Sequence, residues 1–186
     1  ITFWPVDVES RSLCSIWITF DPVERGTSGL EFVRGSQRWP ERYKATTPTH
    51  EPYMLDSDFD DPPDIEGSRD EYDLYCPDMQ PGDCMIFDAH VLHGSTGNYS
   101  TDSPRRAFTT RWAGDDVRLD PRHATMPLLW THGLRAGDTL SGPLFPQVLP
   151  TTIDEEGAAR ATGPEAPDPQ LVEEFVARVA SVPLRG

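Results

Sequence analysis

The sequence predicts an all-β core built from several short strands. Residues 13–20 alternate in side-chain type, with Ile16 and Ile18 on one face and Trp17 on the other, as expected of a strand with one face in a core. The 19 proline and 14 glycine residues are scattered along the chain as turn signals rather than concentrated in one stretch. Such punctuation favours many short strands over long helices.

Four segments have the length and the flanking turn residues of strands, namely residues 13–20, 29–33, 83–87 and 106–112. Between the second and the third, residues 37–80 form a long irregular segment that is rich in proline and acidic residues. A segment of this length is either a lid over a site or a solvated excursion, and both interpretations stay open. Its interspersed aromatic residues favour a lid-like loop, because a purely solvated tract would not need them.

The length of 186 residues suits one domain or a large fragment of one. We assign residues 1–150 to a single β domain and residues 151–186 to a linker followed by an amphipathic helix. Asp168 is the predicted N-cap and Pro169 the first helical residue. The helix has an apolar stripe made of Leu171, Val172, Phe175, Val176 and Val179. This stripe must dock on the domain or on a second subunit of a homo-oligomer, because so short a helix is marginal in isolation.

The chain begins at Ile1 without an initiator methionine, and its first five residues are already apolar and aromatic. Such a start is typical of a segment inside a folded core. We therefore expect that the N-terminal part of the domain lies upstream of Ile1.

The composition argues against several classes of partner. Acidic residues number 31 against 16 Lys and Arg, which gives a formal net charge of −15 and a surface that repels nucleic acid and anionic membranes. No stretch approaches the roughly 20 apolar residues of a membrane-spanning helix, and the first residues lack the pattern of a signal peptide. We expect a soluble cytoplasmic protein that acts on a small molecule and keeps its three cysteines reduced.

The stretch from Pro81 to Asn98 is the most informative for chemistry. A Pro-Gly turn launches a buried strand, and the strand leads to His90 and His93. Neutral imidazole is a common ligand for iron and zinc, and His93 is the stronger candidate for a metal ligand. A single histidine is as readily a hydrogen-bonded residue of the core, so this stretch alone leaves the metal site open.

Arg105 and Arg106 follow shortly after His93, and adjacent strands would bring one of them back beside the histidine. A guanidinium matches a carboxylate in shape and charge, and the hydroxyl of Ser95 can share the same anion. A metal ligand beside a carboxylate receptor suggests an organic acid that chelates the metal at one end and is anchored at the other. The alternative is that the two arginines only flank a strand at the surface.

Four motifs occur in a fixed order along the first 150 residues. They are residues 3–5, residues 15–18 leading to 29–36, residues 81–83 with His93-Gly94-Ser95, and residues 104–107. In order and spacing the chain from Ile1 to Pro150 resembles the phytanoyl-CoA dioxygenase-like family of iron(II) and 2-oxoglutarate dependent oxygenases. The resemblance implies a double-stranded β-helix, a jelly-roll or cupin-like barrel that holds iron through a His-x-Asp/Glu and a distal His.

When the motifs of the family are matched to this sequence residue by residue, the resemblance implies that His93 is the distal histidine ligand. Arg105 would pair with the far carboxylate of 2-oxoglutarate with help from Ser95. Arg106 is the fallback for this role, because the sequence does not fix which of the two points inward. Trp17 matches a position that lines the co-substrate pocket in relatives, although a core aromatic residue explains it equally well.

Four further residues receive roles from the same resemblance. His90 matches a position that is often histidine but is not a ligand, and Asn98 would shape the loop after the ligand. Phe3 and Trp4 would border the path of the substrate together with the acidic residues 51–73. That acidic border favours a neutral or cationic small molecule over an acyl-CoA.

The sequence departs from the family at its start. The His-x-Asp pair should stand immediately before the segment that matches residues 1–5, and no other His-x-Asp or His-x-Glu occurs in the chain. Two of the three expected ligands therefore lie outside the chain, which should bind iron poorly by itself. Relatives that halogenate replace the carboxylate ligand with a small residue, so the missing pair also leaves the reaction type open.

The implied activity is a dioxygenase reaction that uses Fe(II), 2-oxoglutarate and O2. It hydroxylates an unactivated C–H bond of a small molecule and releases succinate and CO2. The alternatives are a metal-free barrel that only binds, a 2-oxoglutarate dependent halogenase, and a zinc enzyme on a cupin-like barrel. An intact His-x-Asp upstream would argue for the oxygenase over the binding module, and a zinc enzyme would have no carboxylate for Arg105 to bind.

Overall fold

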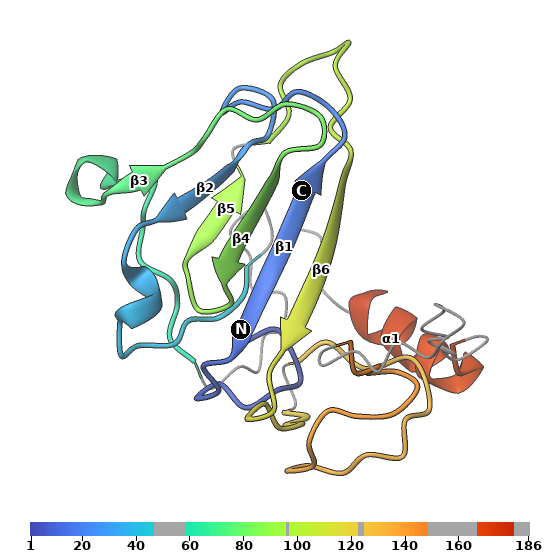
Figure 1. The fold of residues 1–186 in the computed structure, drawn as a ribbon. Coiled ribbons are helices and arrows are strands. Elements are labelled where there is room, and N and C mark those ends of the chain that lie inside the picture. The colour runs from blue at the N-terminus through green and yellow to red at the C-terminus, as the bar shows by residue number, and fades with distance from the viewer. Residues whose placement is uncertain (47–58, 96, 123–124, 149–166, 181–186) are drawn as a thin grey trace.

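The core of the protein consists of two three-stranded antiparallel sheets (Figure 1). They are seen in a computed structural model that describes residues 1–46, 59–95, 97–122, 125–148 and 167–180. In the first sheet, β1 (Leu13–Thr19) lies between β4 (Cys84–Asp88) and β6 (Ala107–Ala113). Strands that are distant in sequence thus pair on both sides of β1.

The second sheet is smaller. Its central strand β2 (Leu30–Val33) pairs with β3 (Leu74–Tyr75) on one side and with β5 (His93–Ser95) on the other. Phe32 of this sheet and Phe87 of the first sheet meet edge to face, with ring centroids 5.0 Å apart. The two sheets therefore face each other across an aromatic contact.

The register of β1 decides which side chains point between the sheets. Trp17 stands opposite Met85 of β4 and Thr109 of β6, and it is only 4% exposed. Together with Val23 and Met79 it forms a buried cluster. The predicted alternation of β1 is confirmed, and the buried face is the one that carries Trp17.

The outer face of the first sheet carries the aliphatic side chains. Ile16 and Ile18 are half-buried, while Ile86 is 64% and Phe108 is 54% exposed. The register places these four residues on the same face, because Ile16 stands opposite Ile86 and Ile18 opposite Phe108. Apolar residues thus form a continuous outer surface on this sheet.

The four predicted strands are present, each within about two residues of the expected bounds. Two strands were not predicted. β5 is three residues long and contains a glycine, and β3 lies inside the segment 37–80 that the sequence marks as irregular. That segment also contains the 3-10 turns η1 (Ser36–Arg38) and η2 (Arg69–Glu71), so the expectation of an irregular loop was wrong for these stretches. Residues 47–58, which include much of the expected lid, lie outside the described residues.

The predicted helix is present as α1 (Pro169–Ala180). The carboxylate of Asp168 accepts a hydrogen bond from the backbone N–H of Gln170 at 2.9 Å, which is the N-cap contact expected when Pro169 is the first helical residue. The backbone N–H of Asp168 donates to the carbonyl of Leu129, so the start of the helix docks on the chain itself. The predicted linker, residues 151–166, lies outside the described residues, and docking of the helix on a second subunit stays a prediction.

Among the described residues, no helix is both long and apolar enough to cross a membrane. The finer assignment as a double-stranded β-helix also stays a prediction. A complete jelly roll has eight strands, and the structure describes six.

Candidate functional site

The turn between β4 and β5 is fixed by His90. The carboxylate of Asp88 accepts hydrogen bonds from the backbone N–H and from Nδ1 of His90, at 2.8 and 2.9 Å. The Nε2 atom of His90 lies 2.9 Å from the carbonyl oxygen of Val8. Both ring nitrogens therefore face protein acceptors, and neither is available to a metal ion.

His93 opens β5 and has one ring nitrogen available. Its Nδ1 donates to the carbonyl of Val91 at 2.9 Å, which leaves Nε2 for another partner. The ring stacks on Phe32 and tilts against Phe87, with centroid distances of 5.8 and 4.9 Å. One side of the residue is still exposed to solvent.

The environment of His93 favours the form that binds metals. Burial against the aromatic rings lowers the pKa of His93 below its ordinary value, and the hydrogen bond to Val91 only partly opposes this. The imidazole is consequently neutral near neutral pH, with an unprotonated nitrogen on its open side. His93 fits the requirements of one nitrogen ligand to iron.

Arg105 and Ser95 meet around Ser28. The Nε of Arg105 donates to the carbonyl of Ser28 at 3.2 Å, and the hydroxyls of Ser28 and Ser95 are hydrogen-bonded to each other. The guanidinium of Arg105 also lies over the ring of Trp17, 4.9 Å from its centroid. Three of the residues predicted for co-substrate binding thus converge at one place.

Arg105 contacts a backbone carbonyl and an aromatic ring rather than an acidic side chain. Among the residues that the structure describes, no carboxylate forms an ion pair with Arg105. Burial lowers the pKa of Arg105 because its charged form is partly removed from water without a compensating anion. A carboxylate bound beside Arg105 would supply a compensating negative charge.

Arg106 is engaged elsewhere. Its Nε and one of its terminal nitrogens donate to the two carboxylate oxygens of Asp21, at 3.0 and 2.7 Å, and its backbone N–H adds a third bond. The pair lowers the pKa of Asp21. Of the two arginines that the sequence left open, Arg106 already has a carboxylate partner and Arg105 does not.

Phe3 and Trp4 lie together near the N-terminus. Their rings meet edge to face with centroids 5.6 Å apart, and Trp4 packs against the buried cluster that contains Val6 and Leu13. On its other side, Trp4 is covered by the guanidinium of Arg111 at 4.0 Å. Arg111 lies on β6, six residues after Arg105, and was not predicted from the sequence, although this even spacing puts two residues of an extended segment on the same face.

Asn98 holds the loop after β5. Its side-chain amide donates to the carbonyl of Ser103 at 2.8 Å, and its oxygen accepts from the backbone N–H of Ser100 at 3.0 Å. This arrangement fits the loop-shaping role that the sequence suggests for Asn98.

The described residues do not complete a metal site. They contain no group of three or more His, Cys, Asp or Glu side chains that could hold a metal ion. His93 is one candidate ligand. That a His-x-Asp pair upstream of Ile1 supplies the other two stays a prediction.

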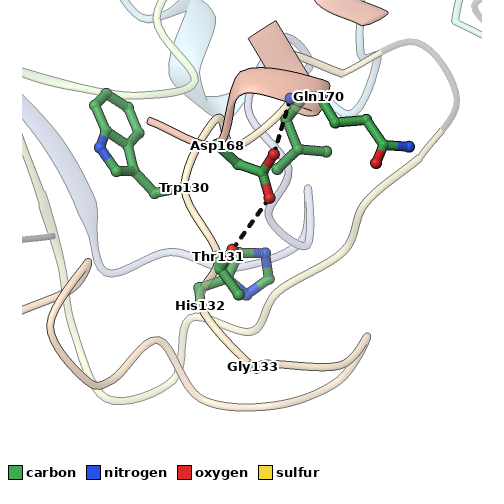
Figure 2. A pocket seen from close by; sticks show the side chains of 7 residues that line it. Trp130, Thr131, His132, Gly133, Asp168 and Gln170 are labelled. Atoms are coloured by element: carbon green, nitrogen blue, oxygen red, sulfur yellow. Dashed lines mark hydrogen bonds between the residues drawn. The ribbon is translucent and has the colours of Figure 1, made fainter. Parts of the chain in front are cut away.

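A surface hollow lies at the other end of the chain, where α1 begins (Figure 2). It is lined by Trp130, Thr131, His132, Gly133, Asp168, Gln170 and Leu171. Asp168 is shared between the cap of α1 and a contact with Thr131. None of the residues predicted for the site lines this hollow.

Comparison with known proteins identifies relatives of this fold. Residues 1–107 match the family model described as phytanoyl-CoA dioxygenase. Comparison with curated proteins gives no match.

Solved structures that share the fold at low sequence identity include the following two. One is SnoN, an epimerase in complex with Fe3+, alpha-ketoglutarate and nogalamycin RO, with a TM-score of 0.57 at 17% identity over 78% of this chain and 53% of SnoN. The other is SnoK, a non-heme alpha-ketoglutarate dependent carbocyclase from nogalamycin biosynthesis. Its TM-score is 0.55 at 20% identity over 78% of this chain and 51% of SnoK. The chain spans about half the length of these structures. Because the family model matches more than half of its residues, the chain belongs to the phytanoyl-CoA dioxygenase family.

Proposed function

We propose that the chain is the C-terminal major part of an Fe(II) and 2-oxoglutarate dependent dioxygenase domain. Its reaction is the hydroxylation of an unactivated C–H bond in a small molecule, with release of succinate and CO2. One observation carries the proposal. The imidazole of His93 and the guanidinium of Arg105 contact the same apolar cluster, through Phe87 in one case and Trp17 in the other.

Each of these residues has a distinct task in the proposed reaction. His93 supplies a nitrogen ligand through Nε2, while its other nitrogen is held by Val91. Arg105 and Ser95 bind the far carboxylate of 2-oxoglutarate, because a guanidinium and a hydroxyl together satisfy the oxygens of one carboxylate. Trp17 forms an apolar wall beside them.

Iron bound at His93 would supply the activation of O2 that the reaction needs. The other two ligands would come from a His-x-Asp pair upstream of Ile1. Phe3 and Trp4 would contact the substrate, since they present a pair of aromatic rings beside Arg111 of β6.

The relatives indicate that the outcome of the reaction can differ within this fold. SnoN is an epimerase and SnoK a carbocyclase, so a reaction other than hydroxylation on the same centre is the first alternative, with halogenation as another. A binding module without metal is a second candidate, because the described residues provide one metal ligand rather than three. A zinc enzyme would use His93 but not Arg105.

The test is an anaerobic titration of the full-length protein with Fe(II) and then with 2-oxoglutarate. We expect the visible charge-transfer band of a chelated 2-oxo acid, and we expect its loss in His93→Ala. His132→Ala is the matched control, because His132 lies in the hollow beside α1. A protein that gives no band would be assigned to the binding module, and a band that survives His93→Ala would remove His93 from the metal site.

A further inference from the structure

Arg111 lies on the inner face of the first sheet. In the register of β6 with β1 it stands opposite Ser15, and Ser15 points to the same side as the buried Trp17. Arg105 precedes β6 by two residues, and its contact with the ring of Trp17 places it on this same side of the sheet. Two guanidinium groups therefore lie on the inner side of the first sheet.

The guanidinium of Arg111 contacts an aromatic ring. Its guanidinium lies 4.0 Å from the ring centroid of Trp4, and within the described part of the chain it has no acidic partner and no hydrogen-bond acceptor. By contrast, Arg106 pairs with Asp21 and Arg69 with Glu31. In a chain with a net charge of −15, an arginine left without an acid is available to an anion from solution.

Arg111 is close to the proposed metal ligand. In the first sheet Phe87 and Arg111 stand on either side of Ser15, and the ring of Phe87 contacts the ring of His93 with centroids 4.9 Å apart. Burial lowers the pKa of Arg111 itself, although one side of the residue is exposed to solvent. An anion could therefore reach Arg111 from outside and still lie near His93.

Arg111 and Arg105 lie over different aromatic rings. The guanidinium of Arg105 covers Trp17 and that of Arg111 covers Trp4, and these two rings pack in separate apolar clusters. If Arg105 binds 2-oxoglutarate, Arg111 is left for a second and different anion.

We propose that Arg111 and Trp4 bind the carboxylate group and the adjoining apolar part of the primary substrate, which makes the substrate a small organic carboxylic acid. This inference rests on the proposed function, because it takes His93 and Arg105 as the reacting side of the site. A carboxylate matches the single charge of Arg111, whereas a dianionic phosphate ester would bring excess negative charge to an acidic protein. The local charge at Arg111 thus opposes the preference for neutral or cationic molecules that the net charge suggests.

The indole N–H signals of the tryptophans provide the test. In a heteronuclear NMR titration of the full-length protein at low ionic strength, hexanoate serves as the carboxylate probe and hexanamide as its neutral counterpart. The signals of Trp4 and Trp17 are assigned with Trp4→Phe and Trp17→Phe. We expect hexanoate to shift the Trp4 signal in a saturable manner and hexanamide to leave it unchanged.

Arg111→Gln should weaken hexanoate binding about tenfold or more, because one charge-assisted contact is lost. The matched control is Arg34→Gln, which removes the same charge from another arginine that covers an aromatic ring, Tyr75 at 4.3 Å. If Arg111→Gln does not fold, Arg111→Lys keeps the charge without the planar fork and should still bind hexanoate more weakly than the native chain.

Three outcomes would overturn the inference. They are no response of Trp4 to hexanoate, an equal response to hexanamide, and a response that survives Arg111→Gln. A stronger response to inorganic phosphate than to hexanoate would overturn the assignment to carboxylic acids. A parallel titration with 2-oxoglutarate reports on Trp17 and Arg105 instead, so failure of the proposed function appears at a different signal from failure of this inference.

Discussion

Asp21 receives three hydrogen bonds from Arg106, two from the guanidinium and one from the backbone N–H. This pairing directs the neighbouring Arg105 toward Ser28 and Trp17 on the inner side of the strand. Two adjacent arginines thus differ in their contacts, since Arg106 pairs with a carboxylate whereas Arg105 donates to a backbone carbonyl and lies over an aromatic ring.

Arg105→Gln should weaken the binding of 2-oxoglutarate by about tenfold or more, because a charge-assisted bond to its carboxylate is lost. Arg106→Gln should leave this affinity nearly unchanged, because the native Arg106 is already occupied by Asp21. Calorimetric titration of both variants in the presence of iron checks the prediction. Equal losses in the two variants would show that the choice of Arg105 is wrong.

The ion pair between Asp21 and Arg106 should make stability depend on pH. Because the pKa of Asp21 is lowered in the folded state, the pair stabilises the fold above the unfolded pKa of about 4, and this stabilisation is lost as pH falls through the folded pKa. Arg106→Gln should therefore lower the melting temperature at about pH 6 and have a smaller effect at about pH 3. A difference between native and variant chains that stays constant with pH would contradict the pairing.

The pKa of His93 provides a check that needs no ligand. Titration of its imidazole proton signals by NMR should give a pKa below the ordinary value of about 6.5, because burial disfavours the charged form. Arg111→Gln should raise this pKa, since it removes a nearby positive charge. Arg34→Gln should not, and an unchanged His93 pKa in Arg111→Gln would place Arg111 farther from the histidine.

The N-cap of α1 predicts a local effect on stability. Asp168→Ala should destabilise the helix by about 1 kcal/mol, because the bond from the N–H of Gln170 and the contact with Thr131 are both lost. Hydrogen exchange of residues 169–180 measures this effect directly. Glu173→Ala, at an exposed position of the same helix, is the control, and equal exchange rates in the two variants would exclude a capping role.

The elements that the sequence predicts correctly are those whose structure a local pattern determines. The alternation around Trp17 and the Asp168-Pro169 cap are local signals, and both elements are present with nearly the predicted bounds. β5 was missed because His93-Gly94-Ser95 has no strand pattern of its own and is held extended by its pairing with β2.

The choice between Arg105 and Arg106 needed contacts that are distant in sequence. Asp21, which occupies Arg106, is 85 residues away along the chain, so no local pattern could reveal it. Arg111 was within reach, because it shares the strand parity of Arg105. The sequence could not show that Arg111 has no acidic partner within the described residues.

The side chain of His90 has a consequence for how the architecture tolerates change. Its ring contacts the carbonyl of Val8, which is 82 residues away along the chain, and the carboxylate of Asp88, which is 2 residues away. It thereby ties the segment that carries Phe3 and Trp4 to the turn that carries His93. One rigid ring, rather than the lengths of the intervening loops, sets the spacing between these two parts. Insertions and deletions between them can therefore accumulate with little change in the dimensions of the interior, which leaves the loops free to diversify around a fixed frame.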